Sequence, residues 1–505
     1  MQSVTRRVAG GAALSAAALA VSIAGQALSV PILLGHWGIS AYGGWLALTN
    51  LASSISLLNL GVQSHVTNQL IVLTARGRNG AAARVLGSAL KLYAVLCLAA
   101  VAGITAGLVL FSPSRIVDTG GIGRAGSLLI VAAHGLLAVY GILGGLLMNL
   151  LRVGGQLPRQ LAYGLIERVA LLSAPILVAC LGGAPPLASW ITVGAMGVID
   201  ATLLRDVFRR TPVPIAPSAG SLREGLRLAA PGLLFAGAAL SPQLLATGIT
   251  LLVSRVAGAA AVVTFTTALM LTNLFRLILN QAVNVLSQEV TLLLATGDRT
   301  RLRHWYSLLW KAGSATAVAA SIVFSASAPA LVRLWTSGRV QVDFELNLLL
   351  CAYLAVHAAG ILSAGFGLAM NRQREVFFVQ LAAGAAALVC CAVSVRKFGL
   401  PGAAASLLCV QTLATAALTV LNGRWLEFRA APLWRRGFPT VAFACASIWL
   451  ARATNGAASA IAVPVSFAAC LSLAWLTWLD AGERNRLLDS VRLLAQRPVT
   501  LAASS

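Results

Sequence analysis

Long runs of apolar residues, separated by short polar segments, occupy most of this chain. A membrane-spanning helix needs roughly 20 apolar residues to cross the ~30 Å hydrocarbon core of a bilayer. Backbone groups in lipid must be satisfied internally, so such runs fold as helices. The pattern predicts an all-α integral membrane protein with about fourteen transmembrane helices. The first should end near Leu34, and the others are expected at about 42–64, 84–111, 127–150, 161–182, 187–206, 226–253, 259–287, 305–333, 345–370, 376–396, 400–422, 438–453 and 457–479.

The N-terminal segment has some features of a signal peptide, because Thr5-Arg6-Arg7 precedes an Ala-rich run. The apolar run continues to Leu34 and further runs follow at once. We therefore expect an uncleaved first helix, with Pro31 kinking or ending it near its outer end.

The domain organisation follows from the longest polar break in the first half, between Arg209 and Arg227. We expect an N-lobe of six helices at 1–208, a cytoplasmic linker at 209–225 and a C-lobe of six helices at 226–425. A further helix pair is expected at 426–480, with a basic cytoplasmic tail at 481–505.

A faint internal repeat supports two pseudo-symmetric lobes. Leu48-Thr49-Asn50-Leu51 recurs 223 positions later as Leu271-Thr272-Asn273-Leu274, and at that offset Gly35 matches Gly258. Lys91 matches Lys311 at an offset of 220, after a basic loop in each half. Parallel repeats of this kind place a substrate site between two lobes that rock against each other.

One polar stripe interrupts the apolar run at 259–287. At about 100° per residue, its members fall on one helix face, with Leu, Ile, Val and Phe covering most of the rest. A guanidinium near the bilayer centre costs roughly 2.5–3.5 kcal/mol. The stripe predicts a helix that faces a wet central cavity, although Asn and Thr also serve as hydrogen-bond glue between helices. Its members are Thr266, Asn273, Arg276, Asn280, Asn284 and Ser287.

A second, softer polar face is expected in the counterpart helix at 42–64. It carries Asn50 and small residues, and it extends to Asn68 if the helix is continuous. Close helix packing through small residues explains such a face equally well.

Other polar residues within the spans are candidates for the same cavity. Glu167 and Arg168 interrupt an apolar run, and they either line the cavity or lie near the cytoplasmic end of their span and reach water by snorkelling. Lys91, at the start of the third span, has the same two readings. Asp200 is expected to pair with a loop arginine. The histidines and glutamines of the spans, among them His357 and Gln411, are expected to bond between helices.

Composition and charge agree with this class. The 505 residues are 58% hydrophobic and 10% charged, with a mean hydropathy of +0.86. The net charge of +23 lies in short loops rather than in a basic domain, which argues against a nucleic-acid partner. With an even number of spans, one side carries a roughly threefold excess of Lys and Arg, so the positive-inside rule places both termini in the cytoplasm.

Motifs for other chemistry are missing from the sequence. The eight cysteines lie in apolar runs without metal or redox spacing. There is no phosphate loop for ATP and no His-Glu-x-x-His. We expect no cofactor, no metal and no enzymatic activity.

The stretch from Leu34-Gly35-His36-Trp37 through Tyr42-Gly43-Gly44-Trp45 to Leu58-Asn59-Leu60-Gly61 resembles a known pattern. It is similar to the first loop and second helix of the polysaccharide transporter branch of the multidrug/oligosaccharidyl-lipid/polysaccharide (MOP) flippase superfamily. Asn59 stands where Asp is commoner in that branch. Asn371-Arg372-Gln373-Arg374 resembles the family's short basic loop after the tenth span.

The resemblance implies a flippase that moves an undecaprenyl-diphosphate-linked oligosaccharide across the bacterial inner membrane by alternating access. Such proteins serve O-antigen, lipopolysaccharide, exopolysaccharide or capsule synthesis, next to a polysaccharide polymerase and among membrane lipids, and a monomer holds a complete path. Arg276 would then contact the diphosphate. Three alternatives stay open: a proton- or sodium-coupled small-molecule antiporter using Glu167 or Asp200, a membrane-embedded polymerase or ligase, and a lipid II flippase.

Overall fold

The computed structural model describes residues 2–55, 62–211, 213–295, 298–370, 372–428, 431–453, 457–480, 482 and 484. These ranges are helical throughout apart from short connections, and they contain no β-strand. Within them, nine helices are long and apolar enough to cross a membrane. The all-α integral membrane class is confirmed.

The α-helices of the described residues are α1 (Gln2–Ser53), α2 (Val62–Ala75), α3 (Asn79–Leu110), α4 (Arg124–Val153), α5 (Leu157–Cys180), α6 (Pro185–Arg210), α7 (Leu222–Ala257), α8 (Ala259–Ala295), α9 (Arg299–Trp335), α10 (Phe344–Ala369), α11 (Gln373–Trp425), α12 (Ala431–Ala453) and α13 (Ala457–Thr477).

Two of these helices each contain two expected spans. α1 breaks at Gly38 (φ 76°, ψ 168°) and α11 breaks at Gly399 (φ 61°, ψ −143°). Only glycine adopts such backbone angles without strain, so each glycine permits a tight connection between two spans. With these breaks, every predicted span except the second overlaps an observed helical segment, and most ends agree to within about five residues. The largest differences are at the end of α8, which continues to Ala295, and at the start of α12, which begins at Ala431.

The second span is not one continuous α-helix. α1 ends at Ser53, a 3₁₀ turn covers Ser54 and Ile55, and α2 begins at Val62. The Ser53 hydroxyl donates to the Thr49 carbonyl at 2.7 Å, and the Ser54 hydroxyl donates to the Asn50 carbonyl at 3.4 Å. Such side-chain bonds compete with helical ones. The expected polar face extends to Asn68 only if one α-helix continues from Asn50, and this condition is not met at Ser54 and Ile55. Asn59 and Gly61 lie outside the described residues.

The internal repeat is visible in the positions of the helices. α3 and α9 begin at residues 79 and 299, and α4 and α10 begin at residues 124 and 344, which is the same separation of 220 positions. Gly38 and Gly258 stand the same distance apart, and Gly258 (φ 89°, ψ 170°) repeats the backbone angles of Gly38. The structural counterpart of Gly258 is thus Gly38, and not Gly35 as the sequence alone had indicated.

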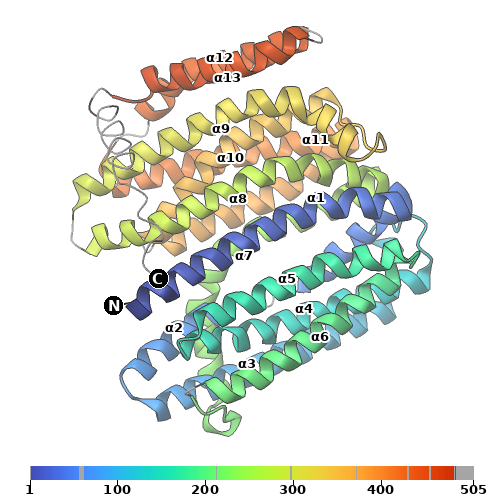
Figure 1. Cartoon of the computed structure of the whole chain (residues 1–505), viewed down its shortest axis with the longest axis vertical. Coiled ribbons are helices and arrows are strands. Elements are labelled where there is room, and N and C mark those ends of the chain that lie inside the picture. The colour runs from blue at the N-terminus through green and yellow to red at the C-terminus, as the bar shows by residue number, and fades with distance from the viewer. Residues whose placement is uncertain are drawn as a thin grey trace, which may run out of the picture. The chain divides into compact units, whose positions relative to one another are not determined.

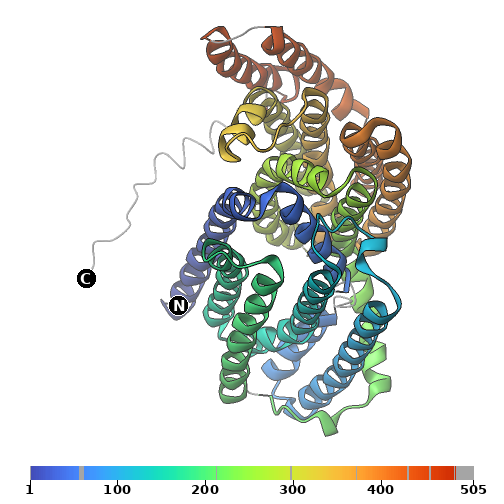
Figure 2. The ribbon, with the colours of Figure 1, turned by 90° about the vertical axis from the view of Figure 1, so that its right-hand side faces the viewer.

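The chain divides into two compact units. The first comprises Met1–Thr267, Val332–Gln341 and Gln373–Leu407. In this unit α5 packs against α1 and α6, and α6 packs against α4, as Figures 1 and 2 both show. Its main core contains Leu70, Leu86, Tyr93 and Leu146, all fully buried. Large apolar side chains on the helices, such as Leu98 of α3, remain exposed, as expected for surfaces that face lipid.

The second unit comprises Ala268–Leu331, Val342–Arg372 and Leu408–Ser505. Its helices are the rest of α8, most of α9, α10, the last part of α11, and the pair α12 and α13, which pack side by side (Figure 1). Tyr306 lies in its core and donates or accepts a hydrogen bond with the Ser363 hydroxyl at 3.1 Å. Thr419 and Asn422 extend this buried network from α11 to Ser363 on α10.

The connection between α6 and α7 is fastened to α3. The Lys91 ammonium donates to the Gly220 carbonyl at 2.6 Å, and the Ser88 hydroxyl donates to the Glu224 carboxylate at 2.9 Å. Gly87 lets the backbone of the connection approach, since a Cβ there would lie 2.7 Å from the Ala216 carbonyl oxygen. We call this contact the linker clasp. The expected lobe boundaries at 208 and 226 stay a prediction.

At the other end of the first unit, the loop between α3 and α4 caps α8. One carboxylate oxygen of Asp118 accepts the Ala259 amide at 2.8 Å, and the other accepts the Gly120 amide at 3.0 Å. The Asp118 amide donates to the Ser254 hydroxyl at 3.0 Å. A carboxylate at a helix N-terminus satisfies an unpaired donor and complements the helix dipole.

Candidate functional site

The polar stripe predicted at 259–287 lies on one continuous helix, α8. Asn273, Arg276 and Asn280 are spaced three and four residues apart, so they share a face, and all three are half-buried. Thr266 bonds back to its own helix through the Val262 carbonyl at 2.6 Å. Asn284 falls within α8, but its side chain, like that of Ser287, lies outside the described ones.

Arg276 is the cation of this stripe, and its neighbours come from α10. The charge of Arg276 acts on Tyr353 and His357, whose rings stack with centroids 4.9 Å apart. The buried Nε of Arg276 has no hydrogen-bond partner among the described residues. The described residues thus leave this Nε donor unsatisfied, and a guanidinium presents a planar set of donors that matches an anion.

α11 completes this group of side chains. The Gln411 amide donates to the Thr415 hydroxyl at 3.2 Å, and that hydroxyl donates to the Val356 carbonyl of α10 at 3.3 Å. Gly360 allows the close approach, because a Cβ there would lie 2.5 Å from the Gln411 amide nitrogen. We name the set formed by Asn273, Arg276, Asn280, Tyr353, His357 and Gln411 the Arg276 cluster.

The sequence pointed to part of the Arg276 cluster. His357 and Gln411 were expected to bond between helices. The Gln411 amide bonds to Thr415 of its own helix, and Thr415 in turn bonds to α10. Tyr353 was missed, since a tyrosine in an apolar run looks like a core residue. The helix period offers a signal in hindsight: Tyr353, His357 and Gly360 recur at four and three residues, on one face of α10.

Arg168 lies half way along α5 in the first unit. Its guanidinium donates to the Ser22 hydroxyl at 2.7 Å and to the Ala18 carbonyl at 3.2 Å, both on α1. Arg168 remains exposed beside these bonds to α1. Whether it lines the cavity or snorkels to water stays a prediction.

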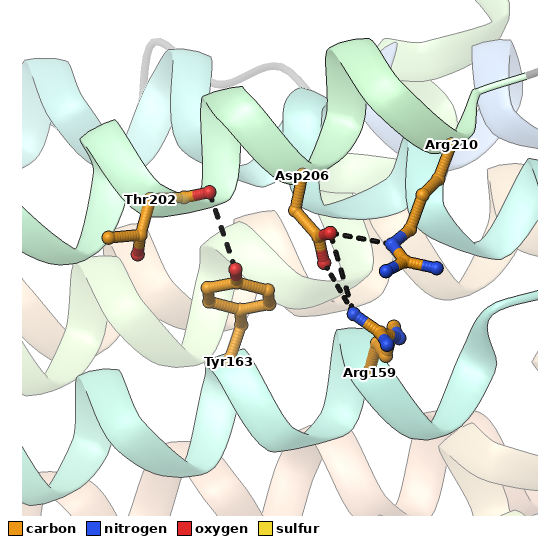
Figure 3. Close-up of polar contacts among 5 residues, drawn as sticks. All are labelled: Arg159, Tyr163, Thr202, Asp206 and Arg210. Atoms are coloured by element: carbon orange, nitrogen blue, oxygen red, sulfur yellow. Dashed lines mark hydrogen bonds and ion pairs between the residues drawn. The ribbon is translucent and has the colours of Figure 1, made fainter.

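Glu167 is half-buried and interacts electrostatically with Asp200 of α6. The expected pairing of Asp200 with a loop arginine is not found among the described residues. Asp206, six residues further along α6, takes that role: it accepts hydrogen bonds from Arg159 at 3.1 Å and Arg210 at 2.6 Å (Figure 3). Asp206 lies near the end of α6, where Arg159 of the first turn of α5 and Arg210 at the end of α6 reach it.

Two further candidates have partners of their own. The Asn50 amide donates to the Leu46 carbonyl of the same helix at 2.8 Å. Lys91 belongs to the linker clasp. Their proposed role in a cavity stays a prediction. Among the described residues, no group of three or more His, Cys, Asp or Glu side chains is placed to hold a metal ion.

The chemistry of the Arg276 cluster suits an anionic, hydroxyl-rich ligand. A guanidinium binds phosphate oxygens in a bidentate manner, and amides bond to sugar hydroxyls. The sequence has no Asp or Glu in the segments that build this part of the second unit, 268–288, 346–370 and 408–426. These segments therefore supply no carboxylate that could pair with Arg276.

No protein-family model and no curated protein sequence matches this chain. Solved structures do match. A multidrug resistance MATE family transporter of the MOP superfamily, in an inward-facing conformation, is 16% identical, with a TM-score of 0.65 over 79% of this chain and 97% of that chain. The lipid II flippase MurJ, in an inward closed conformation, is 10% identical, with a TM-score of 0.65 over 96% of this chain and 99% of that chain.

A third match is a MOP superfamily transporter from Pyrococcus furiosus. Its binding pocket is described as having reverse polarity, which is said to suggest a different function for that protein. It is 16% identical, with a TM-score of 0.57 over 83% of this chain and 95% of that chain. At these identities the likeness establishes the fold. The chain is a multi-pass α-helical membrane protein with the fold of MOP superfamily transporters.

Proposed function

We propose that this protein is a flippase for an undecaprenyl-diphosphate-linked oligosaccharide in the bacterial inner membrane, acting by alternating access of two lobes around a cationic cavity. The observation that carries the proposal is the Arg276 cluster. It presents a guanidinium and several amides within the membrane, from segments that lack acids. Placing an arginine at such a position costs free energy, and this cost argues that the arginine serves a function.

The likeness to MurJ supports a lipid-linked substrate. The alignment with MurJ leaves about 4% of this chain unmatched, or roughly 20 residues. Because α12 and α13 together contain more residues than that, the aligned region includes part of this final helix pair. The MATE transporter is covered almost completely while matching 79% of this chain. The additional length is thus shared with a structure described as a lipid flippase.

The proposal assigns roles to the cluster. Arg276 binds the diphosphate, and Asn273 and Asn280 bond to the sugars nearest to it, with Asn284 next along the same face. In O-antigen, exopolysaccharide or capsule synthesis, the flipped product would then pass to a polysaccharide polymerase. Both termini would lie in the cytoplasm, as the charge pattern predicts.

Arg276→Ala tests the proposal in cells that lack the native copy. A charged hydrogen bond contributes roughly 1.5–3 kcal/mol, so export should fall roughly 10- to 100-fold. The measurements are the lipid-linked oligosaccharide that accumulates on the cytoplasmic leaflet, identified by mass, and the surface polymer. Arg333→Ala is the matched control, because it removes an exposed arginine in the last turn of α9 that belongs to no candidate site. Normal export by Arg276→Ala at equal protein level would contradict the assigned role.

A second candidate function rests on Glu167 and Asp200. These two acids lie close enough to interact in the first unit, and carboxylates within a membrane are the usual sites of ion coupling. A proton- or sodium-coupled drug antiporter would need them. Glu167→Gln and Asp200→Asn should then each abolish export of small organic cations from vesicles, whereas the flippase proposal expects no such export in the native protein.

A further inference from the structure

The second unit contains an apolar cavity of about 430 Å³ between α9, α10 and α12, with Trp478, the residue after α13, also in its wall. We call it the acyl slot. Its walls are almost entirely apolar and include Val318, Phe438, Ala444 and Ile448. The volume falls within the range of roughly 300–1,000 Å³ that is usual for small-ligand sites.

A cationic mouth adjoins the acyl slot. It is lined by Arg299, Arg303, Lys311 and Arg436, with Glu427 and Asp480 as the acids. The Arg299–Glu427 pair (2.8 Å) and the Arg436–Asp480 pair (2.6 Å) are both exposed, and exposed pairs are weak enough to rearrange around a ligand. Arg303 lies over the Phe428 ring, 5.7 Å from its centroid. The described lining therefore carries more positive than negative groups.

Two buried donors lie in the wall of the acyl slot. The hydroxyl of Ser314 and the indole nitrogen of Trp478 are buried and have no hydrogen-bond partner among the described residues. Both residues are more than nine-tenths buried. A buried donor without a partner costs about 1–3 kcal/mol, so an acceptor on a ligand would relieve that cost.

These features follow one another in order along a single face of α9. Successive members of this face are eight, three and four residues apart, which are spacings that keep side chains on one side of a helix: Arg303, Lys311, Ser314 and Val318. The helix rises about 1.5 Å per residue, so the sequence of cation, hydroxyl and apolar wall extends over roughly 20 Å. The cationic end is the end that the charge pattern predicts to be cytoplasmic.

We propose that the acyl slot and its cationic mouth bind one anionic glycerophospholipid from the cytoplasmic leaflet. The phosphate lies among Arg303, Lys311 and Arg436, the ester carbonyls accept from Ser314 and Trp478, and an acyl chain fills the slot. A polyprenyl diphosphate has no ester carbonyl at this depth, so the two unpartnered donors favour a diacyl lipid over the transported substrate. The inference does not depend on the proposed transport function.

Lipid binding to the purified full-length protein tests this site directly. Native mass spectrometry would compare phosphatidylglycerol with phosphatidylcholine of the same acyl chains, with undecaprenyl phosphate, and with inorganic phosphate. One phosphatidylglycerol should bind in preference to phosphatidylcholine. Ser314→Ala removes one hydrogen bond and should weaken phosphatidylglycerol binding about fivefold. Arg303→Gln should reduce the preference for phosphatidylglycerol over phosphatidylcholine.

Thr316→Ala is the matched control, because Thr316 lies on the exposed face of α9 and bonds to the Ala312 carbonyl. It should bind lipid like the native protein. Equal weakening in Ser314→Ala and Thr316→Ala, or equal binding of phosphatidylcholine, would overturn the proposal. Displacement of phosphatidylglycerol by undecaprenyl phosphate, with no effect of Ser314→Ala, would overturn it in favour of a polyprenyl site. Displacement of phosphatidylglycerol by inorganic phosphate would also overturn the proposal, because the cationic mouth would then be an anion site that does not require a lipid.

Discussion

The linker clasp offers a sharp test through glycine substitutions on α3. A Cβ at Gly87 would lie 2.7 Å from the Ala216 carbonyl oxygen and 2.9 Å from the Gly220 amide nitrogen. Both are backbone atoms, so neither can turn aside as a side chain would. We expect Gly87→Ala to push the connection between α6 and α7 away from α3 and to strain the hydrogen bond between Lys91 and Gly220.

The size of the effect follows from two opposing terms. Replacing a helical glycine by alanine stabilises an exposed helix interior by about 1 kcal/mol. Overpacking costs about 1–3 kcal/mol. Gly103, on the same helix, has no atom within 4 Å of its would-be Cβ, so Gly103→Ala gains the first term without the second. The two variants should therefore differ by about 1–3 kcal/mol, with Gly87→Ala the less stable.

Thermal unfolding of the purified variants measures this difference. For a long chain, 1 kcal/mol shifts Tm by about 2 °C or less, so a gap of a few degrees is expected. Trypsin gives an independent readout, because Arg210 and Arg223 flank the connection. A displaced connection should be cut faster in Gly87→Ala than in Gly103→Ala, since exposed and loosened backbone is the preferred substrate. Equal Tm and equal cleavage rates would refute the packing that we infer.

Three further outcomes are expected. Asp118→Asn keeps one acceptor oxygen but loses the negative charge and one of the two accepted amide bonds, so it should destabilise the protein by about 0.5–2 kcal/mol. Asp343→Asn should change Tm little, because the Asp343 side chain makes no capping bond; equal shifts would contradict the role of Asp118. Asp206→Asn should lower Tm slightly at low salt and not at 1 M salt, since its ion pairs lie at the surface; a loss that persists in salt would contradict that. Tyr306→Phe should cost about 0.6–1.7 kcal/mol by removing the interhelical bond to Ser363, and an unchanged Tm would argue against that bond.

The fold could be predicted from the sequence because apolar run length decides whether a helix spans a bilayer. Most helix ends were placed within about five residues, whereas the end of α8 was placed eight residues too early, because its polar stripe interrupts the apolar run before the helix ends. The break after Ser53 was not foreseen, since Ser53 and Ser54 look like small residues of a continuous helix until their hydroxyls bond to the backbone.

The candidate site was predictable only in part. Arg276 stands out because a charge in an apolar run is rare, and that signal needs no tertiary information. Tyr353 gives no such signal, since its role comes from its position near a residue 77 positions earlier in the chain. Asp200 and Asp206 are both acids on α6, and the sequence does not say which one the arginines reach. That choice depends on which acid lies in the last turn of the helix.

The separation of 220 positions between equivalent helices has a consequence for how such a chain arises. Six spans return the polypeptide to the membrane face at which it entered. A duplicated copy fused behind the first therefore inserts in the same orientation, and its basic loops already lie on the correct side. The fusion needs only a short segment on one face, such as the one fastened by Lys91 and Gly220. Duplication of this kind requires no change of topological signals, unlike an inverted repeat, in which the charge bias of one copy must be reversed.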